Sequence, residues 1–246
     1  MNDLDRTLDD VLRTTSIPSI SLNVRVDGAE VYHRTAGLAR LDPERPARED
    51  QPYDLASVTK ALAGSTVTAS LLQEGLLELH APVASVLEGV DPRITTAHLL
   101  THSSGLPAWN AFYAQPTTAW GLASTRRQVL RAARTTAVAH EPGSTHIFTD
   151  IGFLTLLDLI ETRTGARIET LFQERILGPA GLTDLRWGWP MAAATEACPV
   201  RGCVVEGTVH DLNCASIGGT STHAGLFGTA RSVAALAQAL LDAVQE

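Results

Sequence analysis

The sequence predicts a mixed fold, in which an N-terminal α/β part with a helix and a β-hairpin is followed by a mainly helical part. Two patterns predict this. Residues 19–26 and 30–36 have strand character, and Asp27-Gly28 between them is a strong signal for a two-residue turn. From residue 57 to about residue 190, nearly every segment has apolar residues at helical spacing, and Pro or Gly separates the segments.

The first 56 residues account for the α/β part. Leu and Val alternate with charged residues at helical spacing over 3–14, which predicts an amphipathic first helix. The hairpin follows, and a Pro- and Arg-rich stretch over 41–51 then predicts a polar loop. This loop leads into a helix that begins at Ser57.

The rest of the chain predicts helices and one irregular segment. Residues 195–222 are rich in Gly, Ser, Thr and Cys, so we expect irregular structure there. We divide the chain into an N-terminal helix and hairpin (1–56), a helical subdomain (57–195), and a segment that leads back to the α/β part (196–246). Further helices are expected over 67–78, 95–102, 126–136, 150–163, 168–176 and 230–244.

Charge and hydropathy exclude several classes of partner. The net charge is −8 and the isoelectric point is near 5.5, which argues against binding to nucleic acid or to anionic membranes. No apolar run reaches the roughly 18 residues that a membrane span needs, and the N-terminus shows no signal-peptide pattern. We therefore expect a cytoplasmic protein with no membrane span, whose partner is a small molecule.

Three cysteines lie close together near the end of the chain. Cys198, Cys203 and Cys214 have His210 and Asp211 between them, so a metal site is conceivable. Their spacing matches no standard zinc pattern, which favours ordinary reduced thiols. We expect neither a metal nor another cofactor.

Of the nineteen basic residues, eighteen are arginines, and the single lysine follows Ser57 by three positions. In a helix, a residue three positions on lies one turn later on the same face, so the Lys60 amine could reach the Ser57 oxygen. An arginine cannot lose its proton in a protein, whereas a desolvated lysine can become a base. A composition bias that spared one lysine is the alternative explanation.

The chemistry of a serine hydroxyl explains why such a pair would be useful. The hydroxyl is a weak nucleophile until a neighbouring base takes its proton. A helix N-terminus adds unpaired backbone N–H groups and a positive dipole beside it. The stretch after Lys60 carries no charge before Glu74, which suits a buried central helix that could desolvate the amine. We therefore take Ser57 as the candidate nucleophile and Lys60 as its base.

Four segments resemble the serine β-lactamase and penicillin-binding protein superfamily, in the order of that family. The resemblance is strongest to its class C-like branch, which includes esterases and D-alanyl-D-alanine carboxypeptidases. The segments are Ser57-x-x-Lys60, Leu99-Leu-Thr-His-Ser-Ser-Gly-Leu-Pro107, Pro142-Gly through Asp150-Ile-Gly-Phe, and Val209-His-Asp through His223-Ala-Gly-Leu-Phe-Gly.

The resemblance implies both a fold and an activity. The fold is an α/β plus all-α architecture of the β-lactamase/transpeptidase type, with an antiparallel sheet flanked by helices and a large helical subdomain. The activity is that of a serine hydrolase, in which Ser57 forms an acyl-enzyme with a small ester, amide or β-lactam. No cofactor or metal is implied.

The second motif of the family departs from its usual form. Where the family has a tyrosine that passes protons, this chain has Phe148, and a phenyl ring has no hydroxyl to donate or accept. Asp150 fits the motif position that orients the lysine. A carboxylate beside Lys60 would favour the charged ammonium, which opposes its use as a base. Phe148 is expected to bind substrate and Asp150 to take part in catalysis.

The third motif of the family, Lys/His-x-Gly, is uncertain in this chain. His223-Ala-Gly225 has the right letters, so His223 and Gly225 are candidate substrate-binding residues. A helical pattern follows them instead of a strand, and this favours a structural turn. In the family three more strands should follow, so the resemblance implies a fold without its C-terminal strands. The hairpin would then form two strands of an intended five-stranded sheet, which suggests a homo-oligomer or a complementing chain.

Other assignments stay open at this level. The chain could be a catalytically impaired homologue that binds a ligand or a partner, or a fragment of a longer enzyme. His102 could act as a base, but the Thr-His-Ser-Ser-Gly turn favours a structural role for it. The aromatic residues Trp109, Tyr113, Trp120 and Trp187 fit either a cleft mouth or the core.

Overall fold

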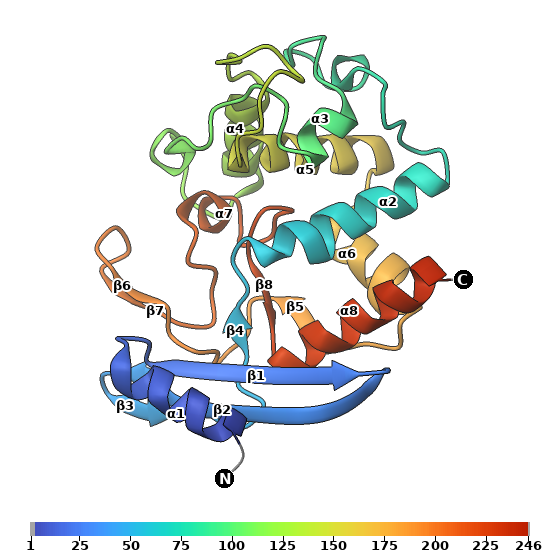
Figure 1. The fold of residues 1–246 in the computed structure, drawn as a ribbon. Coiled ribbons are helices and arrows are strands. Elements are labelled where there is room, and N and C mark those ends of the chain that lie inside the picture. Colours follow the sequence, from blue (N-terminus) through green and yellow to red (C-terminus); the bar gives the residue numbers. More distant parts are fainter. Residues whose placement is uncertain (1–2, 246) are drawn as a thin grey trace.

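The computed structural model describes residues 3–245 and shows a strand layer at one end of the molecule and a helical part at the other (Figure 1). The α/β and all-α architecture expected from the sequence is confirmed. Within residues 3–245, no helix is both long and apolar enough to cross a membrane.

The N-terminal elements form the strand layer. Helix α1 (Asp3–Thr14) precedes β1 (Ser19–Val26) and β2 (Ala29–Leu41), and the three elements match the predicted helix and hairpin. Asp27 and Gly28 both have positive φ, 49° and 78°, as a tight turn between twisted strands requires. The predicted loop over 41–51 is wrong in part, because β3 (Glu44–Pro46) pairs with β2 and gives the sheet order β1-β2-β3.

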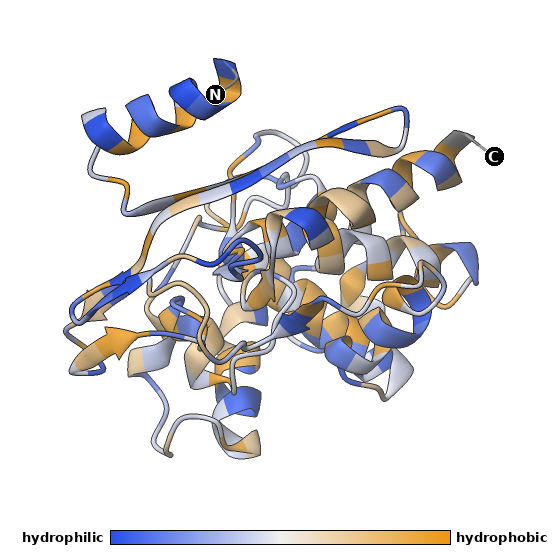
Figure 2. Ribbon diagram, turned by 90° about the horizontal axis from the view of Figure 1, so that it is seen from below, coloured by the Kyte–Doolittle hydropathy of each residue, from blue (hydrophilic) through white to orange (hydrophobic). Residues whose placement is uncertain are grey.

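Two helices flank this hairpin. Helix α1 contacts β2, and the C-terminal helix α8 (Ala230–Gln245) packs against β1 (Figures 1 and 2). Figure 2 shows apolar and polar residues interleaved along α1, as the amphipathic pattern predicts. Leu8 is the buried residue of this helix. The strand layer therefore packs against α1 and against α8.

A second, smaller sheet joins segments that are far apart in the sequence. Strand β8 (Leu226–Gly228) lies between β4 (Tyr53–Asp54) and β5 (Leu185–Trp187), antiparallel to both. The expectation that a helical pattern and no strand follows Gly225 is wrong in part, because β8 comes before α8, which begins at Ala230. This sheet places the end of β4, and hence Ser57, beside the segment around His223.

The helical part is built around α5 (Asp150–Thr164). Its residues from Ile151 to Ile160 are all buried, so the helix is surrounded by protein on every side along this stretch. Helix α2 is shorter than predicted, because the chain turns at Gly75 with φ 70°. The other helices here are α2 (Thr66–Gln73), α3 (Thr96–Leu100), α4 (Ala123–Arg134) and α6 (Ile168–Phe172), with a π-helical turn after α6 over Gln173–Leu177 and short 3₁₀ turns over Val83–Ser85 and Phe112–Ala114.

The segment predicted to be irregular contains regular structure as well. Strands β6 (Glu196–Cys198) and β7 (Cys203–Val205) form a hairpin, and α7 (Leu212–Ser216) follows. Each element is short and lies among turns, so no period was visible in the sequence. The division into 1–56, 57–195 and 196–246 stays a prediction.

Candidate active site

Ser57 lies at the end of a strained turn that connects β4 to a helix. Ala56 has φ 45°, an uncommon conformation for a residue with a Cβ, and the helix begins immediately after Ser57. The Asp54 carboxylate holds this turn, because Oδ1 accepts the Ala56 N–H at 2.8 Å and Oδ2 accepts the His210 N–H at 2.8 Å. This turn leaves Ser57 exposed to solvent.

Lys60 lies beneath Ser57, in the first turn of that helix. Only 4% of Lys60 is exposed. Its Nζ donates to Ser57 Oγ at 2.9 Å, to Asp150 Oδ1 at 2.6 Å and to the His223 carbonyl oxygen at 3.2 Å. A buried amine thus contacts an exposed hydroxyl, and three acceptors surround it. The contact that the Ser-x-x-Lys spacing predicts is present.

The helix is a π-helix over Lys60–Ser65 before it becomes α2. Such turns are rare and occur often at functional sites. Close packing fixes this one. A Cβ on Gly64 would lie 2.9 Å from the Thr222 carbonyl oxygen and 3.1 Å from the Phe153 ring. The helix that carries Lys60 is therefore wedged between α5 and the segment that precedes β8.

Asp150 reaches Lys60 from the N-terminus of α5. The Thr149 hydroxyl caps this helix by accepting the Gly152 N–H at 3.2 Å, and it donates to the Pro107 carbonyl oxygen at 2.6 Å. The Asp150 N–H donates to the Ala108 carbonyl oxygen at 2.8 Å. A carboxylate in the first turn of a helix is favoured by the helix dipole. These contacts fix the backbone at the start of α5, and the carboxylate that it carries contacts Lys60 Nζ.

Phe148 lies over Lys60 on the open side of the site. It is 58% exposed, and its ring centroid is 4.7 Å from Lys60 Nζ. The ring also packs on His102, with the centroids 4.5 Å apart. An exposed ring above an ammonium makes a favourable cation–π contact. It supplies no proton-transfer group at this position.

His102 organises the segment that carries Phe148 and Asp150. It has φ 57°, and its Nδ1 accepts the Thr149 N–H at 3.0 Å. Burial lowers the pKa of His102 from its usual 6.5, and the positive charge of Lys60 lowers it further, while Asp150 opposes this change. A neutral imidazole is the form that can accept at Nδ1. The contacts of His102 are those of a residue that positions the site.

Comparisons with known proteins identify the family of the chain. The sequence model of the Beta-lactamase family matches residues 4–246. The chain belongs to the Beta-lactamase family. Over 279 residues it is 29% identical to a protein of Escherichia coli (strain K12) described as "Putative D-alanyl-D-alanine carboxypeptidase". The match covers 98% of this chain and 64% of that protein, so the chain spans less than two thirds of the length of this relative.

Two solved structures of similar fold illustrate the architecture. The chain resembles a penicillin-binding protein from Bacillus halodurans with a TM-score of 0.77 and 18% identity, over 98% of this chain and 73% of that one. It resembles a D-amino acid amidase from Ochrobactrum anthropi SV3 with a TM-score of 0.75 and 22% identity, over 98% and 71% respectively. At these identities the likeness shows the β-lactamase type of fold, which is as the motifs predicted.

His223 and Gly225, the candidates from the third motif of the Beta-lactamase family, lie behind Lys60. The His223 side chain is 1% exposed, and its Nε2 is 2.9 Å from Asp211 Oδ1 while its Nδ1 is 2.6 Å from Ser221 Oγ. Gly225 has φ 97°, and a Cβ on it would lie 2.4 Å from the Gly219 carbonyl oxygen. We therefore expect neither the His223 side chain nor Gly225 to contact the substrate. The carbonyl oxygen of His223 is what enters the site.

Asp211 is a strongly acidic member of this buried network. Burial by itself would raise the pKa of Asp211, but the charge and hydrogen bond of His223, together with the Cys214 N–H, lower it to about 2. The Cys214 N–H donates to Asp211 Oδ1 at 2.6 Å, because Asp211 caps helix α7. Asp211 is therefore a carboxylate at neutral pH, and in this form it holds the His223 ring.

Two residues that hold the site lie outside the candidate residues of the motifs. Asp54 holds the turn before Ser57, and the Thr59 hydroxyl accepts the Leu226 N–H at 3.2 Å, which ties the helix to β8. The first had a signal in the sequence, since an Asp side chain commonly bonds the backbone two residues on. The second had none, because its partner is 167 positions away.

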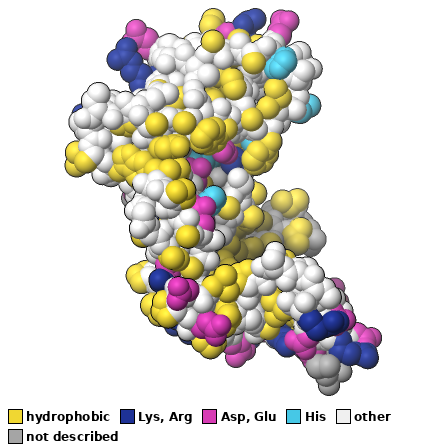
Figure 3. Space-filling model, turned by 90° about the vertical axis from the view of Figure 1, so that its left-hand side faces the viewer, with side chains coloured by type: hydrophobic (Ala, Val, Ile, Leu, Met, Phe, Trp, Pro, Cys, Tyr) yellow, Lys and Arg dark blue, Asp and Glu magenta, His cyan; other side chains and the backbone are white. Residues whose placement is uncertain are grey.

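Aromatic side chains border the open face of the molecule. Trp109 and Trp120 are 49% and 36% exposed, and Tyr113 lies between them with centroid distances of 6.4 and 5.9 Å. Figure 3 shows apolar side chains around a hollow in which acidic and basic side chains lie. Trp187 is different, since it packs edge-on against Phe172 at 5.5 Å. The rings of Trp109, Tyr113 and Trp120 fit a cleft mouth, and Trp187 is partly buried in a different region.

Two cysteines of the C-terminal segment, Cys198 and Cys203, lie opposite each other in the β6-β7 hairpin, and Cys214 lies in α7. Cys198, Cys203 and Cys214 are free thiols, and Cys214 is fully buried, which raises its pKa well above the usual value. Between residues 3 and 245, no cluster of three or more His, Cys, Asp or Glu side chains could hold a metal ion.

Proposed function

We propose that the chain is a serine hydrolase that forms an acyl-enzyme on Ser57 from a small ester, amide or β-lactam. The observation that carries this proposal is the 2.9 Å contact between Lys60 Nζ and Ser57 Oγ, with the amine buried and the hydroxyl exposed. A buried amine next to an exposed hydroxyl is the arrangement that nucleophilic catalysis requires. The names of the relatives, a carboxypeptidase and an amidase, support this class of reaction.

The proposed reaction has two steps. Ser57 Oγ attacks the carbonyl carbon, and its proton passes to a neutral Lys60 amine. The bond to the leaving group then breaks as Lys60 gives this proton to the leaving group. Water then attacks the acyl-enzyme ester and restores the Ser57 hydroxyl. Within residues 3–245 the Ser57 N–H has no hydrogen-bond acceptor, so it is available to the oxyanion that forms in each step.

Lys60 has to be neutral before the first step. Three acceptors around Nζ match the three N–H donors of an ammonium, which has no lone pair for the Ser57 proton. Asp150 Oδ1, at 2.6 Å, is placed to take up the extra proton of Lys60. In this proposal Asp150 is a catalytic residue together with Ser57 and Lys60, and Phe148 contacts the substrate from the open side. A cytoplasmic location and a partner restricted to small molecules remain parts of the proposal.

The proposal is tested by labelling with a fluorescent penicillin and with a nitrophenyl ester. We expect acylation of Ser57 and loss of the label in Ser57→Ala. The control Ser16→Ala changes an exposed serine between α1 and β1 and should keep full labelling. Lys60→Arg should lose as much labelling as Lys60→Ala, because arginine keeps the charge but cannot accept a proton. Normal labelling of Lys60→Arg would refute the assignment of Lys60 as the base.

A second candidate function is supported by Phe148. A homologue without the tyrosine of the second motif could bind a ligand or a partner chain and turn nothing over. In that case the nitrophenyl ester would bind saturably without release of nitrophenol, or would acylate Ser57 once without deacylation. Multiple turnovers that disappear in Ser57→Ala would exclude this alternative.

A further inference from the structure

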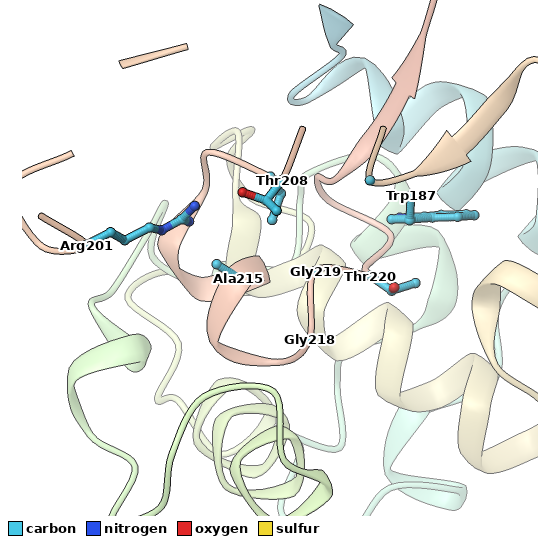
Figure 4. A pocket seen from close by; sticks show the side chains of 9 residues that line it. Trp187, Arg201, Thr208, Ala215, Gly218, Gly219 and Thr220 are labelled. Carbon is cyan, nitrogen blue, oxygen red and sulfur yellow. The ribbon is translucent and has the colours of Figure 1, made fainter. Parts of the chain in front are cut away.

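A pocket of about 330 Å³ lies apart from the residues of the candidate active site (Figure 4). It is formed by the end of β5, the turn between β6 and β7, the chain before α7, α7 itself and the segment between α7 and β8. Its volume is at the lower end of the range for small-molecule sites, roughly 300–1,000 Å³. The lining side chains used below are Trp187, Arg201, Thr208 and Thr220, and Ser57, Lys60 and Asp150 are not among the lining residues.

The pocket contains a guanidinium with unused donors. Arg201 Nη2 donates to the His210 carbonyl oxygen at 3.1 Å, and its Nε is buried without a hydrogen-bond partner. No carboxylate within residues 3–245 lies in ion-pair distance of Arg201. By contrast, the buried Arg126 has Glu161 at 2.8 Å. A buried donor without an acceptor is costly, and the guanidinium has five N–H donors to satisfy.

The acidic groups of the surrounding segments are already engaged. Glu206 pairs with Arg40 and Arg45, and Glu196 Oε1 lies 4.0 Å from His210 Nδ1. Both oxygens of Asp54 accept backbone N–H groups, from Ala56 and His210. Asp211 Oδ1 contacts His223 and accepts the Cys214 N–H. Neither Asp54 nor Asp211 can turn to Arg201 without breaking these contacts. The charge of Arg201 is therefore left for a group from outside the chain.

The opposite wall is flat and apolar. Trp187 is fixed there, because its Nε1 donates to the Ser221 carbonyl oxygen at 3.2 Å and its ring packs edge-on against Phe172. Figure 4 shows Arg201 and Thr208 on one side of the pocket, and Trp187 and Thr220 on the other. Neither threonine hydroxyl has a hydrogen-bond partner in the described chain, so both are available to a ligand.

We propose that this pocket binds a small organic carboxylate with a flat apolar body. The carboxylate accepts hydrogen bonds from the guanidinium of Arg201 and the hydroxyl of Thr208, and the body packs against Trp187. Arginine suits this ligand because its planar fork matches a carboxylate with two parallel hydrogen bonds. The net charge of −8 repels anions in general, so binding depends on this local arrangement.

Benzoate and benzamide are the probes, because they differ in charge and not in shape. Calorimetric titration of the 246-residue chain should show saturable binding of benzoate and at least tenfold weaker binding of benzamide. Arg201→Gln should weaken benzoate binding tenfold or more, and Thr208→Val should weaken it less. Arg127→Gln is the matched control, since it removes the same charge from an exposed position on α4. It should bind benzoate as the parent chain does.

Several results would overturn the proposal. They are no saturable binding of benzoate, equal affinity for benzoate and benzamide, or unchanged affinity in a folded Arg201→Gln variant. Should Arg201→Gln fail to fold, Thr208→Val and Trp187→Leu carry the test. Loss of benzoate binding in Phe148→Ala would place the probe beside Ser57 and would also refute the proposal. Because the readout is binding and not turnover, the outcome is independent of the proposed hydrolase activity.

Discussion

The carbonyl oxygen of His223 lies 3.2 Å from Lys60 Nζ and is the one backbone acceptor among the three partners of that nitrogen. It is fixed in position because the His223 side chain is held at both ring nitrogens, by Asp211 and by Ser221. A Ser-His-Asp row usually suggests a catalytic triad. Here Ser221 is fully buried, so the row instead fixes the backbone beside Lys60.

This relationship predicts how Asp211 affects stability. The folded pKa of Asp211, about 2, lies below its ordinary value of 3.8. The carboxylate therefore contributes stability that is fully present above pH 3.8 and is lost as the pH falls through about 2. Asp211→Asn should lower the free energy of unfolding by about 2 kcal/mol at neutral pH. It should also show a smaller loss of stability than the parent chain between pH 4 and pH 2.

Urea unfolding followed by circular dichroism at several pH values measures this effect. Asp242→Asn is the control, because Asp242 is exposed near the end of α8. If Asp211 fixes the carbonyl beside Lys60, Asp211→Asn should also slow acylation at a pH where the variant is fully folded. A variant with parental stability and parental acylation would contradict the positioning role.

Phe148 leads to a prediction about turnover. Its ring already lies 4.7 Å from Lys60 Nζ, so Phe148→Tyr adds a hydroxyl close to the reacting groups without a change of ring size. We expect faster deacylation or turnover, since a proton-transfer group contributes roughly 10²–10⁴-fold where it acts. Stopped-flow and steady-state rates with a nitrophenyl ester measure the gain. Phe148→Leu, which removes the ring, serves as control, and an unchanged or lower rate in Phe148→Tyr would mean that protons follow another route.

His102 leads to a prediction about acid sensitivity. Its Nδ1 accepts the Thr149 N–H, and an imidazolium cannot accept. Because the folded pKa of His102 is lowered, the neutral form contributes stability that is present above about pH 6.5 and is lost as the pH falls through the lower, folded pKa. Acylation should decline over the same range, as the segment with Phe148 and Asp150 loosens.

Two substitutions of His102 separate this effect from simple packing. Asparagine tolerates positive φ and offers an acceptor oxygen, whereas phenylalanine keeps a ring and offers none. We expect His102→Asn to retain acylation at low pH, without the decline of the parent chain, and His102→Phe to lose activity at every pH. The pH profile of labelling by the fluorescent penicillin measures both. An unaltered profile in His102→Asn would show that another group titrates.

The site could be predicted from the sequence where local geometry or a motif fixes a contact. The contact between Ser57 and Lys60 follows from three-residue spacing in a helix, and Asp150 follows from the family motif. The role of the His223 carbonyl oxygen could not be predicted, because a backbone atom carries no residue identity and its position depends on Asp211, twelve residues away. Asp54 was predictable in principle, as a side chain that bonds the backbone two residues on.

The fold, like the site, has parts that could be predicted from the sequence and parts that could not. The hairpin and the helices α1, α4, α5 and α8 could be predicted, because each has a turn signal or several repeats of an apolar pattern. Strand β3 could not, since three residues in a Pro- and Arg-rich stretch have too few positions to show a period of two. Strand β8 has only three residues as well, and all of them are buried, so they do not alternate.

The strand layer leads to the last prediction. Within the described chain β1 pairs with β2 alone, so one of its edges has unpaired backbone groups. No residue of β1, β2 or β3 belongs to the main buried cluster, and Val26 and Val31 at the hairpin end are 53% and 58% exposed. Unpaired edges with exposed apolar side chains favour association with another chain.

We therefore expect the 246-residue chain to elute above the mass of a monomer, 26.2 kDa, in size-exclusion chromatography with light scattering. It should also bind a dye that reports exposed apolar surface. Val26→Lys places a charge at the end of β1 and should shift the chain toward the monomer, since edge lysines oppose strand pairing. Val244→Lys, the same change on the exposed end of α8, should leave association unaltered. A compact monomer that binds no dye would show that the edge of β1 is protected and that the strand layer is stable alone.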